Sequence, residues 1–201
     1  MDYAKPTERP DMPKFYGFDH VTFWVGNAKQ AATYYTTRLG FEFFAYQGLE
    51  TGNRQYATHV VSNGEVKFAF KTALNPTGHE EFNAHIAKHG DGVKDVAFTV
   101  EDSAGIYERA VARGAKGIME PTKFEDENGF VIMSTVQTYG DTTHTFVQRD
   151  NYKGHFLPDF AVHHFKETYN DLIERPKLEF IDHCVGNQPD GEMEAAGGWY
   201  L

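Results

Sequence analysis

The sequence contains a single cysteine, Cys184, among its 201 residues. One thiol excludes an internal disulfide, and so low a cysteine content is typical of proteins from a reducing compartment. No stretch approaches the roughly 20 consecutive apolar residues that a membrane-spanning helix requires. The first 13 residues are polar and include three prolines, a pattern typical of neither a signal peptide nor a transit peptide. These absences predict a soluble, cytoplasmic protein.

Basic residues are also scarce, because 19 Lys and Arg stand against 29 Asp and Glu and give a net charge of −10. No basic run interrupts this balance, which argues against a nucleic-acid partner. By contrast, hydrophobic residues make up 40% and aromatic residues 15% of the chain, enough to form a packed core. The length fits one domain, or one domain plus a piece of another.

The first part of the chain predicts a β-α-β-β-β unit. Residues 15–25 are rich in β-branched and aromatic types and predict a strand. Asn27 is placed to cap a helix that ends before Gly40. Three further strands are expected over 41–47, 54–62 and 65–72, and the dipeptide Asn63-Gly64 predicts a tight hairpin between the last two.

The same order returns after a linking helix over 80–89. A strand is expected at 93–100, a helix that begins at Asp102 or Ser103 and runs through Arg113, and strands at 115–120, 130–137 and 143–149. Residues 20–25 and 95–100 share only their apolar alternation, two valines and a phenylalanine. The matching order of elements therefore indicates the duplication more strongly than the residue identities do.

Residues 151–177 interrupt this repeat and contain two prolines and a glycine among aromatic residues (Gly154, Pro158, Pro176). We expect an ordered connector here. Beyond it the dipeptide Asp182-His183 repeats Asp19-His20 of the first strand. A third module is therefore expected to begin at about residue 178, with a strand followed by the start of a helix.

Four blocks of the sequence resemble the 4-hydroxyphenylpyruvate dioxygenase family, in its animal-type members. They occupy, in the family's order, residues 19–32, 88–98, 137–145 and 181–189. Their sequences are DHVTFWVGNAKQAA, KHGDGVKDVAF, QTYGDTTHT and IDHCVGNQP. Matched runs of this length are far more specific than a short motif, and together they span most of the chain.

The resemblance implies an α+β vicinal-oxygen-chelate fold, in which paired βαβββ modules form an open barrel. Residues 1–149 would be the non-catalytic N-terminal barrel, 150–177 the inter-domain connector and 178–201 the start of the C-terminal catalytic barrel. The implied reaction converts 4-hydroxyphenylpyruvate and O₂ to homogentisate and CO₂ in tyrosine and phenylalanine catabolism. The parent enzyme is expected to be a homodimer, and the fragment alone is expected to be inactive.

The resemblance makes His183 the candidate metal ligand. Non-haem Fe(II) oxygenases hold iron with two His and one carboxylate, and His183 matches the family's first ligand histidine. The other two ligands would belong to later strands, so no catalytic or cofactor-binding residue is assigned beyond this metal ligand. Strand alternation predicts that Asp182 and Cys184 point away from His183, and that Cys184 is a small buried residue.

Other polar residues receive structural interpretations. His20 is expected to be a remnant on the inner face of the first barrel, where a metal-ligand position would lie nearer Thr145 than His144. The pair His85 and His89 predicts a solvated helix face rather than a zinc site. His163 and His164 are expected at the surface or in packing, and 139–143 is expected to form a tight hairpin whose carboxylate binds turn amides.

Three alternatives stay open. Hydroxymandelate synthase shares the fold and substrate, a paralogue of the dioxygenase would act on another substrate, and a metal-free binding or assembly module would have no chemistry. Continuation of the sequence beyond residue 149 favours the enzyme fragment. A first strand of a third module without its sheet partners would fold back on the first barrel, pair with another chain, or be mobile.

Overall fold

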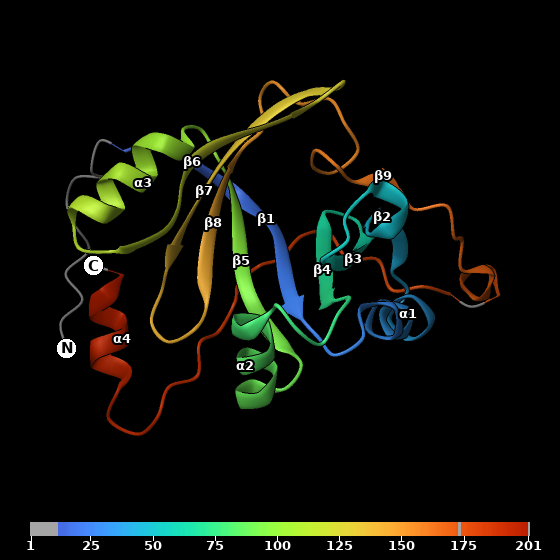
Figure 1. Ribbon diagram of the computed structural model, residues 1–201, viewed down its shortest axis with the longest axis horizontal. Coiled ribbons are helices and arrows are strands. Elements are labelled where there is room, and N and C mark those ends of the chain that lie inside the picture. Colours follow the sequence, from blue (N-terminus) through green and yellow to red (C-terminus); the bar gives the residue numbers. More distant parts are fainter. Residues whose placement is uncertain (1–11, 173, 201) are drawn as a thin grey trace.

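The computed structural model describes residues 12–172 and 174–200, and its elements follow the duplicated order (Figure 1). The first module consists of β1 (Phe15–Trp24), α1 (Ala28–Leu39), β2 (Glu42–Gln47), the 3-10 turn η1 (Leu49–Thr51), β3 (Tyr56–Asn63) and β4 (Val66–Ala73). Helix α2 (Glu80–His89) leads to the second module: β5 (Gly92–Val100), α3 (Ser103–Ala112), β6 (Lys116–Asp126), β7 (Gly129–Gln137) and β8 (Thr143–Gln148). Both predicted β-α-β-β-β units are confirmed.

In the described part of the chain, nine strands form one mixed sheet in the order β6-β7-β8-β5-β1-β4-β3-β2-β9. Strands β1 and β5 pair antiparallel and join the modules, whereas β1 with β4 and β5 with β8 pair in parallel. Val21 lies opposite Val96, and these two residues also occupy equivalent positions in the two modules. The modules are therefore arranged about an approximate two-fold axis between β1 and β5. The sheet curls into an open half-barrel (Figure 1).

Local signals start both module helices as expected. The Asn27 side chain accepts a hydrogen bond from the Gln30 N–H at 3.0 Å, and Gly40 ends α1 in the left-handed region at φ 72°. Of the two candidates for the second cap, Asp102 is the cap, because it accepts from the Gly105 N–H at 3.0 Å. Such caps satisfy amides that the helix leaves unpaired.

The two helices cover the outer face of the sheet. Helix α1 packs Ala28 and Ala32 into a cluster with Val61 and Phe70, and α3 packs Ile106 against Val136. None of the described helices covers the inner face in this way. It is filled instead by residues of the connector, which contains β9 (Ala161–Val162) and the 3-10 turn η2 (Thr168–Asp171).

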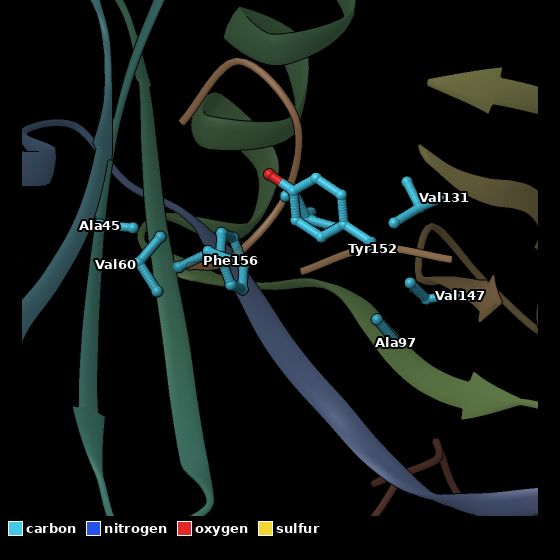
Figure 2. Close-up of a cluster of buried hydrophobic side chains, with 9 residues drawn as sticks. Ala45, Val60, Ala97, Val131, Val147, Tyr152 and Phe156 are labelled. Atoms are coloured by element: carbon cyan, nitrogen blue, oxygen red, sulfur yellow. The ribbon is translucent and has the colours of Figure 1, made fainter. Parts of the chain in front are cut away.

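Two connector aromatics form the centre of the inner cluster. Phe156 lies on the side of Ala45 and Val60, and Tyr152 lies on the side of Val131 and Val147 (Figure 2). Both rings are buried, with 2% and 8% of their surface exposed. Residues 152–157 of the connector are packed as an ordered segment would be, and they close the hydrophobic interior that two modules alone would leave open.

The expected third-module strand is wrong in one respect. Residues 178–185 are not in any described strand; the segment folds back on the β3–β4 hairpin, where the Glu65 N–H donates to the Glu179 carbonyl at 2.9 Å. Gly64, at φ 59°, is required there, because a Cβ would lie 2.0 Å from the Leu178 carbonyl oxygen. Ile181 packs against the α1 cluster. The expected helix is present as α4 (Met193–Trp199), beside the second module (Figure 1).

Strand β6 also differs from expectation, since it runs to Asp126 rather than stopping near Glu120. Pro121 lies in it without cost because the register shifts between Met119 and Thr122, at the free edge of the sheet. No helix in residues 12–172 and 174–200 is long and apolar enough to cross a membrane. The predicted domain limits at residues 149 and 177 stay predictions, and the part of the first domain over 1–11 lies outside the described residues.

Candidate functional site

The candidate metal ligand His183 lies on the segment that folds back on the β3–β4 hairpin. Its side chain is 71% exposed and that of Asp182 is 79% exposed. Upstream, the Leu178 N–H donates to Asn63 Oδ1 at 3.1 Å, which fixes the start of the segment on the first module. His183 is therefore presented to solvent rather than enclosed in a site.

Asp182 does not point away from His183, contrary to the expectation from strand alternation. His183 Nδ1 lies 2.7 Å from Asp182 Oδ2. The alternation argument fails because this segment has no ladder to fix its pleat. Cys184 was expected to be buried, and that expectation is also wrong, since its side chain is exposed.

The same dipeptide in β1 has the same contact in a buried setting. His20 Nδ1 lies 2.7 Å from Asp19 Oδ1, with both residues 6% exposed. A register shift between Phe18 and His20 brings the two side chains to one face. Arg149 Nε and Nη2 donate to Asp19 Oδ2 and Oδ1, each at 2.8 Å, and Thr99 Oγ1 donates at 2.7 Å. Burial by itself raises the pKa of Asp19, but the His20 hydrogen bond and the charges of His20 and Arg149 outweigh it and lower the pKa.

Asp95 is the inner-face counterpart of His20 on β5. Its Oδ1 accepts from Thr143 Oγ1 at 2.6 Å and from Thr145 Oγ1 at 2.9 Å, and Thr135 shares a hydrogen bond of 2.9 Å with Thr145. Burial raises the pKa of Asp95, and the threonine hydrogen bonds only partly oppose it. The group is a closed hydrogen-bond network whose acceptor is already satisfied by hydroxyls.

The last strands of the modules supply no further ligand to this interior. Thr145 faces inward beside Ala97, whereas His144 faces outward and its Nδ1 lies 3.1 Å from the Val96 carbonyl. Thr145 is thus the inward-facing residue of this pair, and the metal-ligand position that the resemblance places near it stays a prediction. The His20 ring lies edge-on to Phe156 with centroids 5.1 Å apart, so the connector occupies the space in front of it.

A complete iron centre cannot be assembled from the residues at hand. Within the described ranges, no group of three or more His, Cys, Asp or Glu is placed to hold a metal ion. His183 offers one imidazole with Asp182 on its Nδ1, while the facial triad needs two histidines and a carboxylate. The described residues therefore fit a single ligand position and not the whole site.

The remaining histidines have structural roles that differ partly from expectation. His85 is not solvated: it is 8% exposed and packs edge-on to Trp24 at 5.1 Å. His89 is partly exposed, and its Nε2 lies 2.8 Å from Asp141 Oδ2. Asp141 also accepts from Lys88 at 2.6 Å, so its carboxylate ties the β7–β8 turn to α2 rather than binding turn amides. Hydrogen bonds from Lys88 and His89 lower the pKa of Asp141 to about 2.

One polar pair could not have been found from the sequence. His59 Nδ1 lies 3.1 Å from Nε2 of His163, which also stacks on Phe43 with centroids 4.5 Å apart. The two histidines are 104 residues apart and neither belongs to a spaced motif. The packing interpretation of His163 is confirmed, and His59 is the partner that the sequence did not reveal.

Comparison with known proteins gives the family. Residues 17–155 match the model of the Glyoxalase/Bleomycin resistance protein/Dioxygenase superfamily. The chain belongs to this superfamily. The matched range covers both modules and ends at the connector residues that fill the inner face, so the superfamily assignment agrees with the duplicated fold.

Curated members of the superfamily match almost the whole chain. A 4-hydroxyphenylpyruvate dioxygenase from Tetrahymena thermophila is 51% identical over 196 residues, which are 96% of this chain and 48% of that protein. The enzyme of the same name from Danio rerio is 49% identical over 98% of this chain and 50% of its own length. The chain thus spans about half the length of the curated relatives it matches, and the family resemblance read from the sequence is confirmed.

Solved structures of the superfamily confirm the fold. A mutant 4-hydroxymandelate synthase from Streptomyces coelicolor superposes with a TM-score of 0.74 at 24% identity, over 94% of this chain and 52% of that chain. Methylmalonyl-CoA epimerase from Mycobacterium tuberculosis superposes with a TM-score of 0.53 at 16% identity, over 67% of this chain and 88% of that chain. At these identities the likeness shows the vicinal-oxygen-chelate fold alone.

Proposed function

We propose that this chain forms the N-terminal barrel and the beginning of the metal-binding part of a 4-hydroxyphenylpyruvate dioxygenase. The reaction is the conversion of 4-hydroxyphenylpyruvate and O₂ to homogentisate and CO₂. The supporting observation is the match of 96% of the chain to a curated dioxygenase at 51% identity. We further propose a homodimeric parent in the cytoplasm, with its role in tyrosine and phenylalanine catabolism.

Fe(II) is the proposed cofactor, and His183 is one proposed ligand. Iron in this class of enzyme supplies the activation of O₂ for reaction with a 2-oxo acid. The Asp182 carboxylate at Nδ1 would fix the imidazole tautomer and leave Nε2 for the metal. The remaining ligands would come from the half of the relatives' length that this chain does not match.

The first barrel has a different proposed role. Its inner face is filled by the connector, and its polar residues are bound to one another, so it contributes packing and subunit contact rather than chemistry. The metal-free binding or assembly module is therefore retained as the function of this barrel within the enzyme, and not as the function of the whole protein.

The test compares the 201-residue chain with the protein encoded by its natural reading frame, read past residue 201 for a second His and a Glu. We expect the longer protein to bind stoichiometric iron and to release homogentisate from 4-hydroxyphenylpyruvate. His183→Ala should abolish iron retention, while the control His164→Ala should not. The 201-residue chain should retain no iron after dialysis, and iron retained by it would contradict the proposal.

The product identity separates the alternatives. Hydroxymandelate formed from the same substrate would identify a synthase, and turnover of another 2-oxo acid with none of 4-hydroxyphenylpyruvate would identify a paralogue. Either product profile would overturn the proposed dioxygenase reaction while leaving the fold and superfamily unchanged.

A further inference from the structure

A cavity of about 460 Å³ lies on the outer face of the second module, between the end of α3 and the C-terminal helix α4. Figure 1 shows these two helices on the same side of β6, β7 and β8. This volume lies in the range that small-molecule sites occupy. The cavity is separate from His183 and from the filled inner face of the barrel.

The floor and walls of the cavity are largely apolar, and five of the lining residues have Phe, Trp or Tyr rings. Phe15 lies edge-on to Phe98 and to Phe146, with centroids 5.7 Å and 5.8 Å apart. Trp199 of α4 packs against the same cluster and closes one side. Flat rings on several walls favour a planar apolar body in the space between them.

His144 lines the cavity as a neutral imidazole ring. Its Nδ1 lies 3.1 Å from the Val96 carbonyl oxygen, which can only accept, so Nδ1 bears the proton and donates. Its Nε2 is then the acceptor for the Tyr200 hydroxyl at 3.0 Å. Burial lowers the pKa of His144, in agreement with a neutral ring.

The charged residues that the structure describes at the rim are both arginines. Arg109 and Arg113, from the end of α3, line the cavity, and no described residue of the lining is acidic. Guanidinium groups bind carboxylates with paired, directional hydrogen bonds. A cation near a helix C-terminus also stabilises the helix by itself, which is a simpler explanation for Arg109 at the end of α3. The experiment must therefore distinguish ligand binding from this structural role.

We propose that this cavity binds a small aromatic carboxylate, with its ring between Phe98, Phe146 and Trp199 and its carboxylate on Arg109 at the rim. The ring requirement follows from the aromatic walls, and the charge requirement follows from Arg109 at the rim. The site depends on neither iron nor His183, so it is independent of the proposed dioxygenase reaction.

The sequence provides a built-in reporter and a matched control. The chain has two tryptophans, of which Trp199 lines the cavity and Trp24 packs on Phe82 of α2. Labelling with 5-fluorotryptophan therefore gives one ¹⁹F signal at the site and one away from it. Arg38 is the matched control for Arg109. It lies in the last turn of α1, as Arg109 does in α3, and both side chains are exposed.

The 201-residue chain is titrated with benzoate, with its neutral analogue benzamide, and with acetate, which lacks the ring. We expect benzoate to shift the Trp199 signal saturably and to leave Trp24 unchanged, with benzamide and acetate weaker by at least about fivefold. Arg109→Ala should weaken benzoate by about fivefold or more, and Arg38→Ala should not change it. Equal binding of benzoate and benzamide, equal effects of the two arginine variants, or no saturable shift would each overturn the proposal.

Discussion

The dipeptide Asp-His occurs in two settings that share one contact and differ in everything around it. In β1 and in the 178–185 segment, His Nδ1 lies 2.7 Å from a carboxylate oxygen of the preceding Asp. Around Asp19-His20 stand Arg149, Thr99 and the Phe156 ring, whereas Asp182-His183 is mostly exposed. The contact between His and Asp thus forms within the dipeptide itself. The surrounding strands decide whether the histidine is buried as a structural residue or exposed to solvent.

The largest expected effect concerns the ring that covers His20. Phe156→Ala removes a side chain that is 2% exposed and should lower the free energy of unfolding by about 4 kcal/mol. Phe180→Ala, near His183 and 63% exposed, should cost less than about 1 kcal/mol. Urea denaturation of both variants measures the difference, and equal costs would show that the inner face is not packed as described.

The next effect concerns the charge that holds Asp19. Arg149→Ala removes two hydrogen bonds to the buried carboxylate and one to the Phe156 carbonyl at 2.8 Å. Removing the arginine partner of this buried carboxylate should cost about 3 kcal/mol. Arg175→Ala breaks a surface pair with Glu42 and should cost less than about 1 kcal/mol in the same denaturation measurement. A small effect of Arg149→Ala would mean that Asp19 is held by His20 alone.

The contribution of Asp19 to stability should also depend on pH. Because the folded state lowers the pKa of Asp19 below the ordinary 3.8, Asp19 stabilises the fold above pH 3.8. That contribution is lost as the pH falls below 3.8 towards the folded-state pKa. Asp19→Asn should therefore be less stable than the wild type at pH 7, and the gap should narrow below pH 3.8. Denaturation at several pH values checks this, and a gap that stays constant down to low pH would contradict it.

The smallest expected effect belongs to the exposed pair. Asp182→Asn and His183→Ala should each change the free energy of unfolding of the 201-residue chain by less than about 0.5 kcal/mol, because exposed ion pairs contribute little. The same Asp→Asn change at position 19 serves as the matched comparison. A loss of several kcal/mol from Asp182→Asn would show that the second pair is enclosed in solution.

The sequence predicted the features that depend on local residues. Asn27 and Asp102 cap the helices, Asn63-Gly64 forms the β3–β4 turn, and the two modules follow in the expected order. These succeed because caps and turns are decided within a few residues.

The features that depend on distant partners could not be predicted. Residues 178–185 have strand-like composition, but they hydrogen-bond to the end of the β3–β4 hairpin and form no described strand ladder with it. For that reason strand alternation predicted the wrong orientation of Asp182 relative to His183. Likewise, nothing local in residues 151–160 shows that Phe156 will enter the inner face, because its partners Ala45 and Val60 lie about a hundred residues earlier.

The connector in the inner face also bears on ligand competition. A segment attached to the barrel by its own backbone is present at an effective concentration of about millimolar, whatever the dilution of the protein. Any free molecule that entered in front of His20 would have to displace Phe156 and Tyr152 against this tethered competitor. The interior of the first barrel is therefore occupied by its own chain. Positions that are open to a ligand lie on other surfaces of the molecule.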